Sequence, residues 1–182
     1  MIDLAPALAP SRLATARGGA RGVAPSVRRA AASELGEVAR LVNRAHAVER
    51  SFVEGERVSA AQLAAMRERG HFLVLDDDDG ALVAAVYVAM APDDAGDGGT
   101  MALLSVAPER QGEGLGRRLL AVAEALCAAV GCGSIELEFV SLRPELGAWY
   151  RSQGYAEVGT AGLEGRRALK PCHVVRMQKP LA

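Results

Sequence analysis

The sequence has little with which to hold a metal ion or to build a disulfide framework. Its three cysteines, Cys127, Cys132 and Cys172, are an odd number and lack the C-x-x-C spacing of zinc and redox sites. We interpret them as reduced thiols of a protein core, which is typical of a cytoplasmic protein. The three histidines are scattered along the chain, so the sequence predicts no metal site.

Net charge and long hydrophobic runs are scarce as well. The formal net charge is −1, which gives no reason to expect a general nucleic-acid-binding protein. No apolar run is as long as a membrane span, so we expect no membrane partner. A chain of 182 residues, 50% of them hydrophobic, suits one domain with a substantial core. A monomer and a homodimer are both compatible with these properties.

The N-terminal stretch differs in composition from the rest of the chain. Residues 1–24 are rich in Ala, Arg, Pro and Gly and show neither helical nor strand periodicity. This composition predicts a disordered extension that carries no chemistry. Transit peptides also begin rich in Arg and poor in acids, but the Pro and Gly content argues against an amphipathic helix here. We therefore expect residues 25–182 to form the folded domain.

Hydrophobic periodicity in that domain predicts a mixed α/β sheet. A short strand at 27–30 precedes two amphipathic helices, the first capped by Ser33 and the second by Ser59. The elements expected after them are strands at 71–75, 82–90 and 100–106, a helix at 115–130, a strand at 134–140, a helix from Pro144, and strands at 155–158 and 172–177. The early strands form hairpins, whereas the helical crossover requires parallel strands on either side of it.

A glycine-rich turn joins the strand at 100–106 to the helix that follows. The chain passes through Gly112, Gly114 and Gly116 into the helical pattern. Glycine lets a ligand approach the backbone, and unpaired N–H groups at a helix start attract anions, most often phosphate. A P-loop needs Lys followed by Ser or Thr, and a dinucleotide fingerprint needs G-x-G-x-x-G spacing. Neither pattern is present in this turn.

Two motifs together resemble those of one enzyme superfamily. The pattern Gln-x-x-Gly-x-Gly at 111–116 resembles the acetyl-CoA pyrophosphate loop of the GNAT superfamily of N-acetyltransferases. Its second motif, Tyr-x-x-x-Gly-[Phe/Tyr] after the next strand, is matched by Tyr150, Gly154 and Tyr155. The resemblance extends over residues 27–181. It implies a GNAT-like acyl-CoA N-acyltransferase fold, with about seven strands and four helices, in which the strands at 100–106 and 134–140 splay around pantetheine.

The resemblance also implies a reaction and a way of holding its donor. Acetyl-CoA would be the co-substrate, and a primary amine of a small molecule or peptide would attack it directly in a ternary complex. Main-chain groups of Leu104, Ser105 and Val106 would hold pantetheine, and a backbone amide there would polarise the thioester oxygen. The pyrophosphate would lie on the loop formed by Gln111, Gly112, Glu113, Gly114, Leu115, Gly116 and Arg117. Arg117 is preferred over Arg110 and Arg118 as its cationic contact, because the helical period turns it toward the loop.

The catalytic groups are less well specified. The resemblance implies that Tyr150 is the general acid for the leaving thiolate, since a phenol with a pKa of about 10 stays protonated at neutral pH. The general base stays open between Glu138, Glu49, Glu136 and His173, and a water relay would remove the need for one. Many relatives have Asn seven residues before this Tyr. Here that residue is Arg143, to which we do not assign the role of that Asn; a different contact of Arg143 with substrate or cofactor stays open.

Residues 49–57 are expected to cover the acceptor side of the site. Glu49, Glu54 and Glu56 are candidates to hold a cationic amine and Arg57 a carboxylate, while a solvated loop with ordinary surface charge is the alternative. Two other functions stay open for the whole chain. One is a GNAT fold that binds acetyl-CoA as a ligand or sensor without turnover, and the other is a different nucleotide-phosphate binder.

Overall fold

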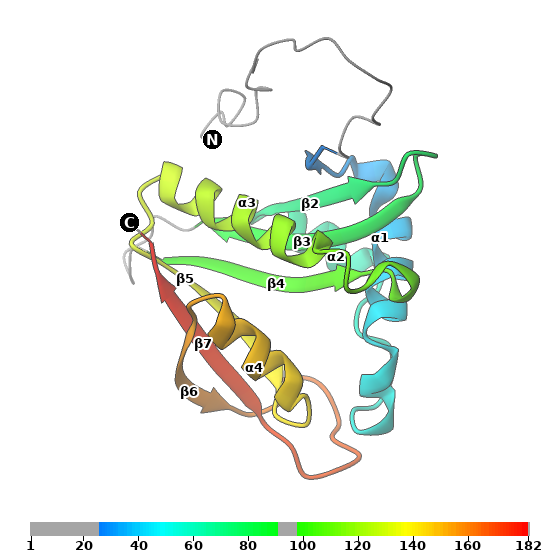
Figure 1. The fold of residues 1–182 in the computed structure, drawn as a ribbon. Helices are drawn as coiled ribbons and strands as arrows, with labels where there is room; N and C mark the ends of the chain where they lie inside the picture. Colours follow the sequence, from blue (N-terminus) through cyan, green and yellow to red (C-terminus); the bar gives the residue numbers. More distant parts are fainter. Residues whose placement is uncertain (1–25, 91–97, 182) are drawn as a thin grey trace, which may run out of the picture.

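The computed structural model describes residues 26–90 and 98–181. The expected extension, residues 1–24, lies outside the described residues. The described chain forms one seven-stranded sheet with four α-helices (Figure 1). This confirms the fold class predicted from the sequence, a mixed α/β sheet of about seven strands and four helices.

The elements follow one another in the predicted order. The strands are β1 (Arg28–Arg29), β2 (His71–Asp76), β3 (Leu82–Met90), β4 (Gly98–Val106), β5 (Ser134–Val140), β6 (Ala156–Ala161) and β7 (Val174–Pro180). The helices are α1 (Leu35–Ala45), α2 (Ala60–Arg67), α3 (Leu115–Ala129) and α4 (Pro144–Ser152), with short 3-10 turns η2 (Ala32–Glu34), η3 (Ala47–Ser51) and η4 (Pro108–Arg110). Within the described ranges, we find no helix that is both long and apolar enough to cross a membrane.

The sheet has the order β1-β2-β3-β4-β5-β7-β6, with one parallel pair at its centre. The pairs β1–β2, β2–β3 and β3–β4 are antiparallel, and β7 pairs antiparallel with both β5 and β6. Strands β4 and β5 are parallel and are connected through α3. The predicted crossover is therefore confirmed.

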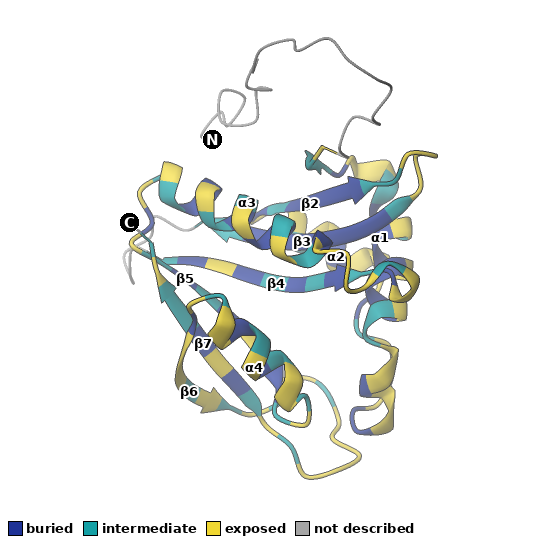
Figure 2. Cartoon of the chain, viewed as in Figure 1, coloured by how far each residue is buried: buried dark blue, intermediate teal, exposed yellow. Residues whose placement is uncertain are grey.

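Helices cover both faces of the sheet. Helices α1 and α2 pack on one face, where Val38, Val42 and Leu63 are fully buried, and α3 and α4 lie on the other (Figure 1). The inward side of α3 contributes Leu119 and Ala123 to the larger core (Figure 2). Each helix buries an apolar stripe against the sheet, so the site must lie where this packing is interrupted.

One of the two expected helix caps is confirmed and the other is wrong. The Gln62 N–H donates to Ser59 Oγ at 3.2 Å, which makes Ser59 the cap of α2. Ser33 lies inside the 3-10 turn η2 instead of capping α1. The Glu34 carboxylate provides the side-chain hydrogen bond at the start of η2, where it accepts the Ala31 N–H at 2.6 Å and is itself held by Arg28.

The interruption lies between β4 and β5. Their ladder begins at Gly98 opposite Ser134 and ends at Met101 opposite Leu137, so the later residues of both strands are not paired with each other. The pairing of β3 with β4 is irregular at the same level, and Leu103 has a φ of 57°. Such a bulge bends a strand and increases its twist. The two central strands therefore diverge toward their C-terminal ends, as the resemblance implied.

A buried side chain anchors the segment between α1 and α2. Asn43 of α1 is 7% exposed; its Nδ2 donates to the Val58 carbonyl at 2.8 Å, and its Oδ1 accepts the Val58 N–H at 3.0 Å. These two bonds fix the backbone next to Arg57. The side chain thus replaces the backbone partners that Val58 would have in a sheet.

We expect Asn43→Ala to reduce the free energy of unfolding by about 2–4 kcal/mol, because two buried backbone groups lose their partners. Urea denaturation measures this loss. Arg44→Ala is the matched control on the same helix; its exposed ion pair with Glu109 predicts a loss below about 1 kcal/mol. Equal losses in the two variants would contradict the anchoring role.

Candidate functional site

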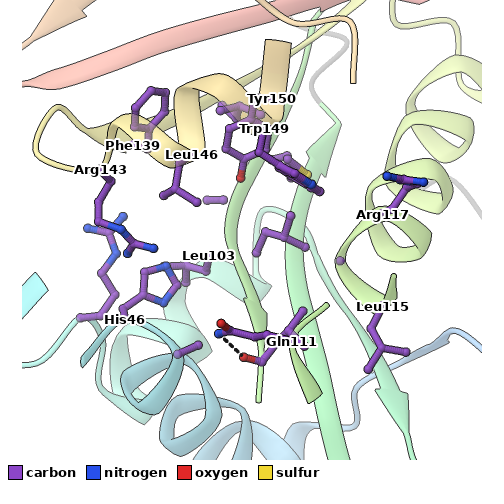
Figure 3. Close-up of a pocket in the computed structure, with 18 of the residues that line it drawn as sticks. His46, Leu103, Gln111, Leu115, Arg117, Phe139, Arg143, Leu146, Trp149 and Tyr150 are labelled. Atoms are coloured by element: carbon purple, nitrogen blue, oxygen red, sulfur yellow. Dashed lines mark hydrogen bonds between the residues drawn. The ribbon is translucent and has the colours of Figure 1, made fainter. Parts of the chain in front are cut away.

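A cavity of about 470 Å³ occupies the gap between the diverging strands. Its walls come from the end of α1, the C-terminal halves of β4 and β5, the loop before α3, and α4 (Figure 3). In this view Arg117 and Leu115 lie on one side, and His46 and Arg143 lie on the other. The cavity therefore joins the glycine loop to the segment expected to bind the acceptor.

The glycine loop has the backbone geometry of an anion site. Gly112 and Gly114 have φ values of 85° and 83°, and no atom lies within 4 Å of the place where a Cβ would be at either residue. Gly114 is the N-cap of α3, whose first helical hydrogen bond runs from the Arg118 N–H to the Gly114 carbonyl at 3.0 Å. The amides of residues 115–117 precede that bond, so they are free to face a ligand.

Eight of the ten residues expected to bind the donor line the cavity: Leu104, Val106, Gln111, Gly112, Gly114, Leu115, Gly116 and Arg117. The side chain of Ser105 is buried on the other face of β4, where its Oγ donates to the Leu103 carbonyl at 2.9 Å. Glu113 points away and pairs with Arg110 at 2.8 Å. The contacts expected of Ser105 therefore fall to its main chain alone.

The main chain of β4 supplies a second recognition element. Beyond Met101 no β5 residue is paired with β4, and Gln111 Nε2 donates to the Val106 carbonyl at 3.3 Å (Figure 3). A strand edge with unpaired N–H and C=O groups binds an extended ligand as an added strand would bind. This edge leads from the glycine loop toward Tyr150 along one wall of the cavity.

Tyr150 is held rigidly by other aromatic rings. Its ring centroid lies 4.9 Å from that of Trp149 and 5.7 Å from that of Tyr155, and the residue is 7% exposed. Burial raises the pKa of the Tyr150 hydroxyl above its ordinary value, an effect that nearby Arg143 partly offsets. A phenol in this setting is protonated at neutral pH, so it is able to donate a proton inside the cavity.

The candidate bases are not equally well placed. Glu138 lines the cavity and pairs with Arg176 at 3.5 Å. Glu136 pairs with Arg176 at 2.9 Å on the sheet surface, and neither it nor His173 lines the cavity. Glu49 lines the cavity but is surrounded by arginines. We therefore drop Glu136 and His173 as candidates for the base.

His46, the residue directly after α1, lines the cavity although no sequence pattern predicted it as a site residue. Its Nδ1 lies 2.9 Å from the Val42 carbonyl, which sets Nδ1 as the protonated nitrogen and leaves a lone pair on Nε2. Burial lowers the pKa of His46; Arg57 and Arg143 lower it further, and Glu49 opposes them. His46 is thus a neutral imidazole on the cavity wall. No motif or spacing marks it, because only the tertiary fold brings it to the site.

Glu49 is 3% exposed and lies at the centre of three guanidinium groups. Its carboxylate is 3.8 Å from Arg57, 3.7 Å from Arg143 and 3.6 Å from Arg166. The other two acids of the expected acceptor segment, Glu54 and Glu56, are exposed and do not line the cavity. Of that segment, only Glu49 and Arg57 reach the site.

Comparison with known families agrees with this geometry. The family model described as the acetyltransferase (GNAT) family matches residues 38–155, which include the glycine loop and Tyr150. The chain belongs to the GNAT family of acetyltransferases. A comparison with curated proteins gave no match.

Solved structures of GNAT proteins share the fold. The ribosomal-protein-S18-alanine N-acetyltransferase from Escherichia coli has a TM-score of 0.68 at 19% identity, covering 87% of this chain and 94% of that one. A GNAT superfamily phosphinothricin acetyltransferase from Sinorhizobium meliloti, solved with AcCoA, has a TM-score of 0.69 at 20% identity, covering 88% and 90%. At these identities the comparison shows the fold alone. The match of the family model confirms the GNAT resemblance that the two motifs indicated.

We expect Gly114→Ala to raise the dissociation constant of CoA about tenfold, equivalent to about 1.4 kcal/mol. A side chain disfavours the positive φ at this N-cap by about 1–2 kcal/mol, so the loop relaxes and its amides turn from the ligand. Isothermal titration calorimetry measures the affinity.

Gly131→Ala is the matched control, because Gly131 follows the other end of α3 with a φ of 88° and equally open surroundings. It should lose similar stability and retain CoA affinity. Unchanged affinity in Gly114→Ala would argue against an anion site at this loop.

Proposed function

We propose that this GNAT protein transfers the acetyl group of acetyl-CoA to a primary amine of a small molecule or peptide, by direct attack in a ternary complex. The observation that carries the proposal is the single cavity that joins the glycine loop, the open edge of β4, Tyr150 and His46. Each of these supplies one requirement of acyl transfer from a thioester to an amine. A binding module without turnover would need the first two only.

The donor is held by backbone groups in this proposal. The free amides at the start of α3 bind the pyrophosphate, and Arg117 adds a charge-assisted contact beside them. The unpaired edge of β4 beyond Met101 binds the pantetheine amides, and one of its N–H groups polarises the thioester carbonyl. Acetyl-CoA supplies an acetyl carbon that the amine attacks, with a thiolate as leaving group.

In this proposal one side chain accepts the proton of the amine and another donates a proton to the leaving group. His46 Nε2 accepts a proton from the attacking amine, because its Nδ1 proton is committed to the Val42 carbonyl. Tyr150 donates its proton to the departing sulfur. One proton is taken up and one is released, so the site as a whole keeps its charge. Glu138 is the remaining carboxylate candidate for the base, whereas both oxygens of Glu49 already face guanidinium groups.

We expect Tyr150→Phe to lower kcat about 10²- to 10⁴-fold, the usual contribution of a positioned acid. The dissociation constant of acetyl-CoA should change little, since the ring and its aromatic contacts remain. Steady-state kinetics and calorimetry measure the two quantities. Wild-type turnover in this variant would remove the acid role, and binding without turnover of any amine by the wild type would favour the binding module.

We expect kcat/KM to rise with pH through a pKa below 6.5 and then to level off, because burial lowers the pKa of His46 and only the neutral imidazole accepts a proton. His46→Gln should lower kcat and abolish that inflection. An unchanged pH profile in His46→Gln would assign the base elsewhere, and Glu138→Gln would then be the variant to measure.

A further inference from the structure

Three guanidinium groups surround the Glu49 carboxylate, so the positive charge of this arginine cluster exceeds the single negative charge at its centre. Arg143 also pairs with the exposed Glu145. Arg57 and Arg166, by contrast, have Glu49 as their one ion-pair partner within the described part of the chain. Two guanidinium groups thus share a single carboxylate in a largely buried place.

The hydrogen bonds of this cluster are incomplete as well. The contacts of Arg57 and Arg166 with Glu49 measure 3.8 and 3.6 Å, longer than hydrogen bonds. Arg57 Nε, Arg166 Nε and Arg166 Nη1 are buried and have no hydrogen-bond partner among the described residues, and the same is true of Glu49 Oε2, which is too far from both arginines for a hydrogen bond. Buried polar groups without partners are costly and rare in folded proteins. These donors therefore suit an oxyanion, which accepts two parallel N–H bonds from a guanidinium group.

Contacts between segments that are distant in the sequence hold this cluster together. Arg166 lies in the β6–β7 connection, which is tied to the segment after η3 by the bridge between Val53 and Ala168. The Glu54 N–H also donates to the Arg167 carbonyl at 2.9 Å. Arg57 is fixed by the Asn43 anchor of its neighbour Val58. The two arginines are thus preorganised before any ligand arrives.

The cluster adjoins the space where the acceptor would lie. A second cavity of about 230 Å³ has Arg57 and Arg166 in its wall, and it shares Arg57, Glu138 and Phe139 with the main cavity. His46, the proposed base, lines the main cavity together with Arg57 and Arg143. Arg143 and His46 lie together in Figure 3, across the cavity from Arg117. An amine bound near His46 would therefore lie close to guanidinium groups.

We propose that the acceptor is a small amino acid-like molecule, a primary amine with a carboxylate or another oxyanion a few bonds from its nitrogen, and that Arg57 and Arg166 bind this oxyanion. The inference rests on the proposed transferase function and deepens it. Glu49 holds the arginines in place and cancels one of their charges. A polyamine is disfavoured at this end of the cavity by like charge, and a protein N-terminus lacks the oxyanion close to its amine.

The test is an acceptor panel with matched derivatives. Common L-amino acids are screened with acetyl-CoA, and each acceptor found is compared with its C-terminal amide and with the amine that lacks the carboxyl group. We expect kcat/KM to be about 10- to 100-fold higher for the acid, as expected for hydrogen bonds to a charged group. Amidated peptides and polyamines complete the panel. Equal efficiency of acids, amides and simple amines would overturn the inference and leave the transferase function standing.

Substitutions of two neighbouring arginines, Arg166 and Arg167, test the binding role. Arg166→Ala should raise KM for the acid about 10- to 100-fold and leave KM for the amide unchanged. Glu49 keeps Arg57 and Arg143 in this variant, so the fold is retained. Arg167→Ala is the control, because the Arg167 side chain is 76% exposed against 19% for Arg166 and pairs with Glu54 outside the cavity. The same loss in both variants would contradict a binding role for Arg166.

Thermal shift separates this inference from the proposed function. Amino acids that raise the melting temperature of the wild type but not of Arg166→Ala, without any turnover, would support the oxyanion site and contradict the transferase proposal. If no acid is acetylated and none raises the melting temperature in the presence of CoA, the inference is wrong even where CoA itself stabilises the protein. Ligand stabilisation follows the ratio of concentration to dissociation constant, so millimolar acids test weak binding as well.

Discussion

The parallel pairing of β4 and β5 ends after four residue pairs, and the rest of the site depends on that divergence. The bulge at Leu103 bends β4 away from β5 where β4 leaves the sheet core. A cavity opens that no helix fills, although helices cover both faces elsewhere (Figure 1). Strand β4 thereby exposes backbone groups that a regular sheet would have paired. The start of α3 adds unpaired amides at one end of the same space.

The two ends of the cavity differ in their charged and polar groups. The donor end offers backbone amides and the exposed Arg117, which suit phosphate without any buried charge. The far end has a buried carboxylate enclosed by guanidinium groups, an arrangement that is costly in the absence of a ligand. Between the ends lie a protonated phenol and a neutral imidazole, each kept so by burial. Their environments push the two pKa values apart, as acid–base pairs require.

Local signals in the sequence were sufficient for most of the fold. The bounds of β3 and β5 were predicted to the residue, because continuous apolar or alternating runs end at clear turn residues. The glycine loop was identified from the spacing of its glycines, of which Gly112 and Gly114 have positive φ values that other residues avoid. The prediction that Ser33 caps α1 was wrong, because the Glu34 carboxylate accepts the Ala31 N–H there and is itself held by Arg28 of β1.

The acceptor end could be predicted only in part, through Glu49 and Arg57. Glu49 and Arg57 belong to the segment 49–57, whereas Arg143 and Arg166 come from two other segments, and nothing in the sequence around Arg166 distinguishes it from Arg167 beside it. The connection that carries both arginines is tied to the segment after η3 by the bridge between Val53 and Ala168. His46 was missed for a related reason, since its role depends on the strand edge that it faces. Long-range contacts, which no local periodicity reports, determine this half of the site.

The most direct test of the account is hydrogen–deuterium exchange with and without acetyl-CoA, measured in peptides covering residues 98–106 and 111–120. We expect slower exchange in both segments, because the donor binds along the open edge of β4 and on the amides that begin α3. Residues 60–67 of α2, away from the cavity, should exchange at the same rate in both states. Protection of the loop without protection of β4, although acetyl-CoA binds, would contradict the claim that the divergence of β4 and β5 forms the donor site.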